Sequence, residues 1–298
     1  MTEERSDAGG PTVPPYGGAR SLAGGRWVAR GGGPLTRLTP MAQRRHDGSA
    51  GDADYGALGS TYSRYRRPDP RLAAVIAQAL GEARTVLNVG AGAGSYEPTG
   101  REVTAVEPSA VMRAQRPAHL APAVDATAEQ LPFADDSFDA AMTTFSVHQW
   151  QDLPAGLAEL RRVTRGPVMI LTCDPSRVEE FWVREYAPEV LEVEARRYPS
   201  PEALADGLGG SVSISTVLIP QGCTDGFTEA YYGRPEHLLD AEAQRACSAW
   251  SLVEPAVIDR FTRELAGDLL DGTWDARHGA LRTLPCYEGS LVLLVAEP

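Results

Sequence analysis

The sequence predicts an α/β fold in which a mostly parallel β-sheet carries helices on both faces. The main observation is an alternation, from residue 71 to residue 175, between short apolar runs of strand length and stretches with helical periodicity. A run of glycines follows the first of these strands, and an acidic residue ends the second. An open α/β sheet binds its ligands at this edge, where the carboxyl ends of the strands lie.

The elements of this core follow one another at short intervals. The first helix is expected over Leu72–Ala83, where apolar residues recur at helical spacing after Pro68 and Pro70. Ser109 is the expected N-cap of the second helix. The expected strands are short and apolar: Thr85–Val89, Glu102–Val106, a stretch near Pro122–Val124, Phe138–Thr144 and Pro167–Thr172. The other expected helices of the core are Ser109–Arg116 and Leu153–Val163.

Beyond Pro175 the pattern changes. Two further strands are expected, Ser211–Ile219 and Ser290–Ala296, with about seventy residues between them. A hairpin needs only a few connecting residues, so this mainly helical excess is interpreted as an inserted cap. The helices expected in this part are Arg177–Val193, Pro201–Leu208, Glu242–Trp250 and Pro255–Leu270.

Residues 1–50 differ in composition from the rest of the chain. They contain ten glycines and five prolines without apolar periodicity, which is typical of a segment that buries too little apolar surface to fold. We therefore expect a disordered tail over 1–50 and one folded domain over 51–298. Translation from Met41 stays open as an alternative to Met1.

The charged residues exclude several functions. All 28 basic residues are arginine, so neither a Schiff-base lysine nor a P-loop lysine exists. Seven of these arginines and four of the 40 acidic residues lie in the tail, which leaves 21 basic and 36 acidic residues on the folded part. Such an acidic surface repels nucleic acid phosphates, so no nucleic acid partner is expected.

The remaining composition indicates a cytoplasmic protein without a metal site. The four cysteines and five histidines are scattered, with neither CxxC nor metal-ligand spacing, and free thiols suit a reducing compartment. No run approaches 18 apolar residues and no apolar segment follows the N-terminal charges, so no membrane span and no export signal are expected. Abundant Arg, Ala and Gly without Lys indicate GC-rich coding and favour a bacterial origin.

The most informative segment is VLNVGAGAGSYEP, which starts at Val86. It places Gly90, Gly92 and Gly94 directly after the first strand, where glycine lets the backbone approach a ligand closely. Glu107 ends the second strand, and a carboxylate there can accept both hydroxyls of a ribose. Together these features predict an adenosine-containing cofactor.

The spacing of the glycines distinguishes between cofactors. A dinucleotide fingerprint places a third small residue five positions after the first glycine, which from Gly90 is Ser95, a mild mismatch. The observed G-x-G-x-G is instead the pattern of S-adenosylmethionine methyltransferases. Two alternatives stay open: an NAD(P)-dependent oxidoreductase and a non-catalytic protein that retains a methyltransferase fold.

From Tyr55 to Thr172 the chain resembles the small-molecule class I methyltransferases, the group that includes ubiquinone and menaquinone methylases. The matching blocks are VLNVGAGAGSYEP, VTAVEPS, VDATAEQLPFADDSFDAAMTTFSVHQW and ELRRVTRGPVMIL. The resemblance implies a Rossmann-like sheet with an antiparallel last strand, and S-adenosyl-L-methionine as the cofactor. It also implies a lid at 51–70, a cofactor-binding core at 71–175 and a substrate or cap region at 176–298.

The resemblance further implies roles for matching positions. Residues 90–94 would wrap the methionine and ribose, Glu107 would hold the ribose hydroxyls, and Asp125 with the Ala126 backbone would recognise the adenine. Asn88 replaces the family's usual Asp and would weaken cofactor binding without abolishing it. The positions implied to bind the cofactor are Asn88, Gly90, Ala91, Gly92, Gly94, Glu107, Pro108, Asp125, Ala126, Thr144, Phe145 and Arg67.

The expected activity is methyl transfer to a small-molecule acceptor by in-line displacement. The aromatic-bearing cap favours a small, apolar acceptor, and the protein is expected to be a monomer or homodimer. His148 is the candidate general base, since its ordinary pKa lies near working pH, although His148–Trp150 would equally suit a packing cluster. Tyr62 and Arg67 are the first lid candidates, with Tyr55 and Tyr65 next, although these aromatic residues could simply anchor a surface arm. Whether O, N, C or S is methylated stays open.

Overall fold

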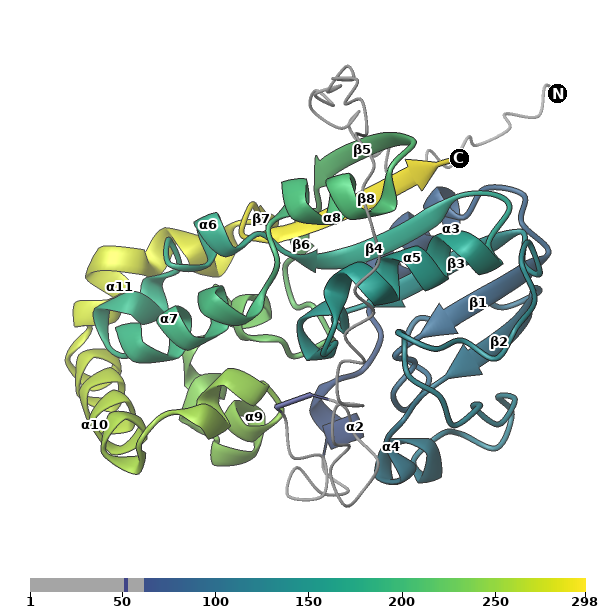
Figure 1. The fold of residues 1–298 in the computed structure, drawn as a ribbon. Helices are drawn as coiled ribbons and strands as arrows, with labels where there is room; N and C mark the ends of the chain where they lie inside the picture. The colour runs from purple at the N-terminus through teal and green to yellow at the C-terminus, as the bar shows by residue number, and fades with distance from the viewer. Residues whose placement is uncertain (1–50, 53–61) are drawn as a thin grey trace, which may run out of the picture.

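The computed structural model describes residues 51–52 and 62–298. The expected tail over 1–50, the start at Met41 and the lid candidate Tyr55 lie outside the described residues. One six-stranded sheet forms the centre of the molecule, with helices packed against its two faces (Figure 1). Its order is β2-β1-β3-β4-β8-β5, from β2 (Glu102–Val106), β1 (Thr85–Val89), β3 (Ala140–Thr144), β4 (Val168–Cys173), β8 (Leu291–Glu297) and β5 (Ser211–Thr216).

The direction of the strands agrees with the predicted fold class. β1 pairs parallel with both β2 and β3, and β3 pairs parallel with β4. The last strand, β8, is antiparallel to both of its neighbours. The expected strand near Pro122–Val124 is only an isolated bridge between Val106 and Val124, because Pro122 has no N–H with which to extend a ladder.

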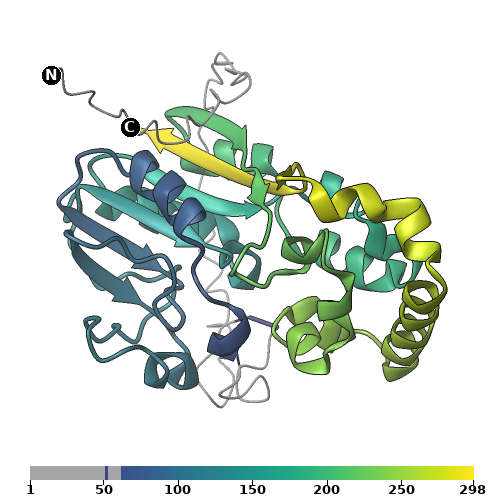
Figure 2. The same ribbon diagram turned by 180° about the vertical axis from the view of Figure 1, so that it is seen from behind.

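Two layers of helices cover the sheet. On one face, α3 (Pro70–Ala79) buries Leu72 and Ile76 against the strands, and Asp69 caps its first turn. The opposite face is covered by α5 (Leu153–Val163) and α8 (Pro201–Leu208), which pack against each other (Figures 1 and 2). Ser109 caps α4 (Ala110–Ala114), as predicted.

Apart from α8, β5 and β8, the chain after β4 forms a largely helical region beside the sheet rather than over it (Figure 1). The single helix predicted over Arg177–Val193 is wrong: α6 (Pro175–Val178), the 3₁₀ turn η2 (Trp182–Glu185) and α7 (Pro188–Arg197) take its place, because Pro188 must begin a new helix. The helix predicted over Glu242–Trp250 is likewise divided. The further helices are α9 (Ala241–Arg245), α10 (Pro255–Asp271) and α11 (Thr273–His278), and the further 3₁₀ turns are η3 (Thr228–Tyr231), η4 (Pro235–Leu239), η5 (Ser248–Leu252) and η6 (Gly279–Thr283).

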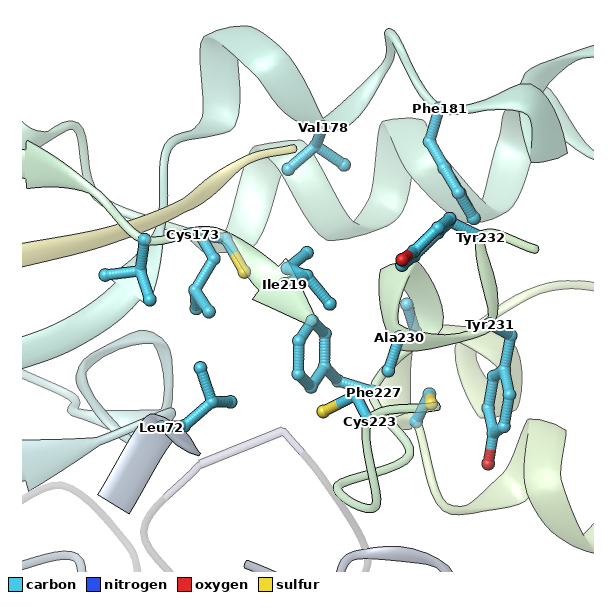
Figure 3. Packing of buried hydrophobic residues seen from close by; sticks show 14 of the residues in the cluster. Leu72, Cys173, Val178, Phe181, Ile219, Cys223, Phe227, Ala230, Tyr231 and Tyr232 are labelled. Atoms are coloured by element: carbon cyan, nitrogen blue, oxygen red, sulfur yellow. The ribbon is translucent and has the colours of Figure 1, made fainter. Parts of the chain in front are cut away.

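The region after β4 shares a core with the sheet. Side chains from α3 (Leu72), the end of β4 (Cys173) and the segment around Phe227 and Tyr231 converge in one buried cluster (Figure 3). The predicted strand Ser211–Ile219 ends early at Thr216, and Ile219 belongs to a separate two-stranded ladder, β6 (Ile219–Pro220) with β7 (Cys286–Tyr287). The short helix α2 (Tyr62–Tyr65) lies against α9, so the N-terminal described segment touches this region.

Candidate active site

A glycine at position 90 is required by the geometry of the turn after β1. Its φ of +69° favours glycine, and a Cβ there would lie 1.8 Å from the Ser146 hydroxyl oxygen. The amides of Gly90 and Ala91 both donate to the carbonyl of Val106, at 2.9 and 3.0 Å. The loop is therefore fixed against the end of β2, with its backbone open to a ligand on the other side.

Glu107 lies directly after β2, and its carboxylate forms a further contact with the glycine loop. Its carboxylate accepts the Gly92 amide at 2.8 Å through one oxygen and the Ser109 amide at 2.8 Å through the other. Burial raises the pKa of Glu107, and the two amide donors act in the opposite direction. Each oxygen retains a lone pair, so the carboxylate can still accept hydroxyl groups from a ligand.

A cleft opens at the carboxyl ends of β1, β2 and β3, which is the sheet edge at which the sequence predicts ligand binding. It is lined by the following predicted site residues: Gly90, Ala91, Gly92, Glu107, Pro108, Ala126, Thr144, Phe145 and Tyr62. The cleft has further lining residues that the sequence analysis did not select, among them Arg66, Tyr96, Met112, Ser146, Gln149 and Asp225.

Four predicted cofactor residues do not line this cleft. Gly94 and Arg67 line a separate groove, and Arg67 is exposed. Asp125 is largely exposed and pairs with Arg113 at 3.0 Å. Asn88 is buried and donates through Nδ2 to Glu97 at 3.2 Å. These four positions lie outside the cleft lining, and their roles in cofactor binding stay predictions.

Arg66 occupies the place that was predicted for Arg67. It lines the cleft, and its guanidinium lies 5.1 Å from the Phe145 ring centroid and 5.7 Å from that of Tyr62. Its Nε donates to Asp225 at 2.5 Å, and only 12% of the Arg66 side chain and 3% of the Asp225 side chain are exposed. The two charges therefore compensate each other inside the protein.

Phe145, directly after β3, has a strained backbone. Its φ of +51° lies in the left-handed region, which bulky residues rarely occupy. Its amide donates to the carbonyl of Leu171 at 2.9 Å, and its ring packs 5.3 Å from that of Phe227. Such strain concentrates at functional sites, where the surrounding structure holds it in place.

A second cavity, the inner chamber, adjoins the cleft and shares three residues with it: Tyr62, Arg66 and Phe145. It is closed by residues from η1 (Val147–Gln149), the end of β4, α7 and the region from Phe227 to Ala249. Its other lining residues are His148, Cys173, Glu194, Tyr198, Phe227, Thr228, Ala246, Cys247, Ser248 and Ala249.

The structure changes the case for His148 as a base. His148 lines the inner chamber, and its ring lies 4.5 Å from that of Tyr198. Burial is the main cause that lowers its pKa to about 3, with the positive charges of Arg197 and Arg66 contributing. The argument from an ordinary pKa near neutrality is therefore wrong, since an imidazole with so low a pKa is a weak proton acceptor. Tyr62 lines both cavities, and burial raises its pKa above the usual 10.

A parallel sheet with one antiparallel strand, a glycine turn and a buried acid at the end of the second strand defines the Rossmann-like class of cofactor-binding enzymes. Residues 87–170 match the family described as "Methyltransferase domain". The chain belongs to the class I S-adenosylmethionine-dependent methyltransferases, and the following similarities support this assignment.

Two curated relatives and one solved structure have comparable sequence identity to this chain. A demethylmenaquinone methyltransferase of Mycolicibacterium paratuberculosis is 30% identical over 157 residues, which cover 44% of this chain and 68% of that protein. A malonyl-[acyl-carrier protein] O-methyltransferase of Pseudescherichia vulneris is 31% identical over 164 residues, covering 52% and 65%. A crystal structure from Anabaena variabilis, described as a methyltransferase from an antibiotic biosynthesis pathway, superposes with a TM-score of 0.73 at 27% identity and covers 78% of this chain and 99% of that chain.

The described part of the chain lacks a membrane-spanning helix and a metal-binding cluster. None of its helices combines the length and apolar character needed to span a membrane. Among the same residues, no group of three or more His, Cys, Asp and Glu side chains is arranged to hold a metal ion.

Proposed function

We propose that this methyltransferase transfers the methyl group of S-adenosyl-L-methionine to a small-molecule acceptor. The observation that carries the cofactor assignment is the pairing of Glu107 with the Gly92 amide at the mouth of the cleft, 2.8 Å apart. This contact fixes both a carboxylate for ribose hydroxyls and a glycine backbone that a ligand can approach closely. Ala91, Pro108 and Ala126 supply apolar walls beside it.

The cofactor supplies an electrophilic sulfonium methyl, so the protein mainly has to position the acceptor and exclude water. Thr144, Phe145 and Tyr62 lie where the cleft meets the inner chamber, and we assign them to the reacting end of the cofactor. The Arg66 ion pair connects the segment from Tyr62 to Asp69 with the region around Asp225. We assign these two segments as the lid.

The inner chamber supports a small acceptor. Its walls include the rings of Phe145, Phe227 and Tyr198, and three of its lining residues, Tyr62, Arg66 and Phe145, also line the cleft. A folded protein or a nucleic acid would not enter such a space. We therefore assign the inner chamber to the acceptor and the cleft to the cofactor.

Calorimetric titration separates this proposal from the oxidoreductase alternative. Purified protein is titrated with S-adenosylmethionine, S-adenosylhomocysteine and NADH in parallel. We expect micromolar binding of the first two and none of NADH; binding of NADH alone would contradict the proposal. Radiolabelled S-adenosylmethionine with a cell extract then tests the acceptor, and we expect label in the small-molecule fraction rather than in protein.

A further inference from the structure

One carboxylate faces the inner chamber. Glu194, on α7, is the only acidic residue among the lining residues of the described chain. Within the described residues, no hydrogen bond or ion pair connects its carboxylate to another side chain. Burial is the main cause that raises the pKa of Glu194 to about 7, against the lowering effects of Arg197 and Arg66.

The nearby positive charges already have partners. Arg66 pairs with Asp225, and Arg197 pairs with Asp52 at 2.6 Å. Neither guanidinium is therefore available as a dedicated counter-ion for Glu194. A half-buried carboxylate without a protein partner takes its hydrogen bonds from solvent or from a ligand, so this chamber offers an acceptor to a ligand's hydrogen-bond donor.

Apart from Arg66, the other titratable side chains that line the chamber with Glu194 stay neutral around pH 7. His148 has a pKa of about 3, and burial raises the pKa of both Tyr198 and Cys173 well above their usual values. Burial raises the pKa of Cys247 to about 12. Glu229, which interacts with Glu194 electrostatically, is committed to the Ser290 amide and hydroxyl. Glu194 is therefore the group in the chamber best suited to exchange a proton near neutrality.

Part of the chamber wall is aromatic and favours a planar group. The Phe145 and Phe227 rings pack against each other, and the neutral His148 ring lies against Tyr198 on another part of the wall. Aromatic walls bind flat apolar groups with favourable ring contacts. Glu194 is the one carboxylate among the described lining residues, and a carboxylate beside such aromatic walls favours a ring that carries a hydrogen-bond donor.

We propose that Glu194 binds the nucleophile of the acceptor, which is a neutral hydroxyl or amino group on an aromatic ring, and takes its proton during methyl transfer. This inference rests on the proposed function. A lone pair on the acceptor oxygen or nitrogen forms the new bond to the methyl carbon, the carbon–sulfur bond breaks with its electron pair going to sulfur, and the acceptor proton goes to the Glu194 carboxylate. A carboxylic acid would not be an acceptor, because its anion would face the Glu194 carboxylate.

Four small probes test this recognition without knowledge of the natural acceptor. Phenol, aniline, toluene and benzoate are titrated at pH 8 into the full chain saturated with S-adenosylhomocysteine. We expect phenol and aniline to bind at least tenfold more tightly than toluene, and benzoate not to bind. The affinity for phenol should increase as the pH rises through about 7, because ionised Glu194 is the stronger hydrogen-bond acceptor.

The test variant is Glu194→Gln, with Glu192→Gln as the matched control. Glu192 lies on the same helix, but it is exposed and pairs with Arg196 at 3.7 Å. In Glu194→Gln we expect the ratio of the affinities for phenol and benzoate to fall at least tenfold. The pH dependence of the affinity for phenol should disappear. The melting temperature and the affinity for S-adenosylhomocysteine should stay the same. Glu192→Gln should behave as wild type in every titration.

Three results would overturn the inference. Benzoate could bind the wild-type protein as tightly as phenol, Glu194→Gln could leave the discrimination unchanged, or no ring probe could bind the loaded protein. Each of these leaves the cofactor assignment intact, because S-adenosylhomocysteine binding is measured in the same samples. Failure of S-adenosylhomocysteine to bind would instead contradict the proposed function and this inference together.

Discussion

The hydroxyl of Tyr96 donates a hydrogen bond to Oδ2 of Asp225 over 2.9 Å, although 129 positions separate the two residues in the chain. Oδ1 of the same carboxylate accepts from Arg66. Through Asp225, the glycine turn is therefore connected to the segment that precedes the core and to the helical region after β4. All three residues line the cleft, so this network holds together part of the wall of the proposed cofactor site.

Removal of Asp225 should destabilise the protein far more than removal of the Tyr96 hydroxyl. Asp225→Ala leaves the buried Arg66 charge without its partner, which costs about 3–5 kcal/mol. Tyr96→Phe removes the hydrogen bond to Asp225 and the longer one that the hydroxyl accepts from the Asp69 amide, but it preserves the ion pair, so its cost should be about 1–2 kcal/mol. Urea unfolding of both variants measures the difference. Equal losses would show that the ion pair does not hold the network together.

The glycine turn should tolerate no side chain at position 90. Gly90 and Gly100 both have positive φ, but a Cβ at Gly90 would overlap the Ser146 side chain, whereas a Cβ at Gly100 meets nothing within 4 Å. We expect Gly100→Ala to cost only the backbone strain, about 1 kcal/mol, with cofactor affinity unchanged. Gly90→Ala should cost more and weaken S-adenosylmethionine binding at least tenfold. Thermal melting with calorimetry tests this pair, and similar behaviour of the two variants would refute the steric argument.

Much of this core could be predicted because its signals are local. The bounds of β1, β2, α5 and α8 agree with those expected from apolar periodicity and the flanking Pro, Gly and Asp residues. The prediction of a single helix over Arg177–Val193 was wrong. Its apolar spacing continues across Pro188, but a proline in a helix interior costs more free energy than this spacing contributes, so a new helix begins there. The order of elements thus follows from the sequence, and errors occur where one residue interrupts a longer pattern.

The site was less predictable, because it depends on which way each side chain points. Arg66 and Arg67 are adjacent and chemically equal, and only the ion pair with the distant Asp225 distinguishes the buried one. Glu194 carries no sequence signal, since an acid on an amphipathic helix is normally exposed. The inner chamber becomes visible only when α7 packs beside β4 and the region around Phe227.

The stability of the protein should depend on pH through Glu229. Burial is the main cause that raises its pKa to about 7, above the value of 4.5 expected in the unfolded chain. The proton is thus held more tightly in the folded state, so the stabilisation is complete below pH 4.5 and is lost as the pH rises through about 7. The shift corresponds to about 3 kcal/mol at most.

Glu229→Gln removes this titration and leaves a side-chain oxygen to accept the Ser290 amide. We expect its stability relative to wild type to increase between pH 5 and pH 8, measured by urea unfolding at both values. The exposed Glu192→Gln serves as the control and should show no such change. A constant difference between Glu229→Gln and wild type at the two pH values would be inconsistent with a raised pKa.

Restoring an acid at position 88 should destabilise this chain. The Asn88 amide donates to Glu97, which is buried and pairs with Arg116 at 2.9 Å. Asn88→Asp replaces the donor by a second carboxylate 3.2 Å from the first, so one of the two must bind a proton or repel its neighbour. We expect a lower melting temperature at pH 8 and partial recovery at pH 5. An unchanged melting temperature at both pH values would argue against this contact.

In the proposed function, Glu107 and the glycine turn bind S-adenosylmethionine. The most direct measurement is a calorimetric titration of S-adenosylmethionine into wild type, Glu107→Ala and a control, Glu102→Ala, at the exposed start of the same strand. Loss of the charge-assisted hydrogen bonds from the Gly92 and Ser109 amides and of the contact with the ligand should weaken binding by about 100-fold in Glu107→Ala. Glu102→Ala should bind as wild type does. Equal affinity of the two variants, with both folded, would contradict the account.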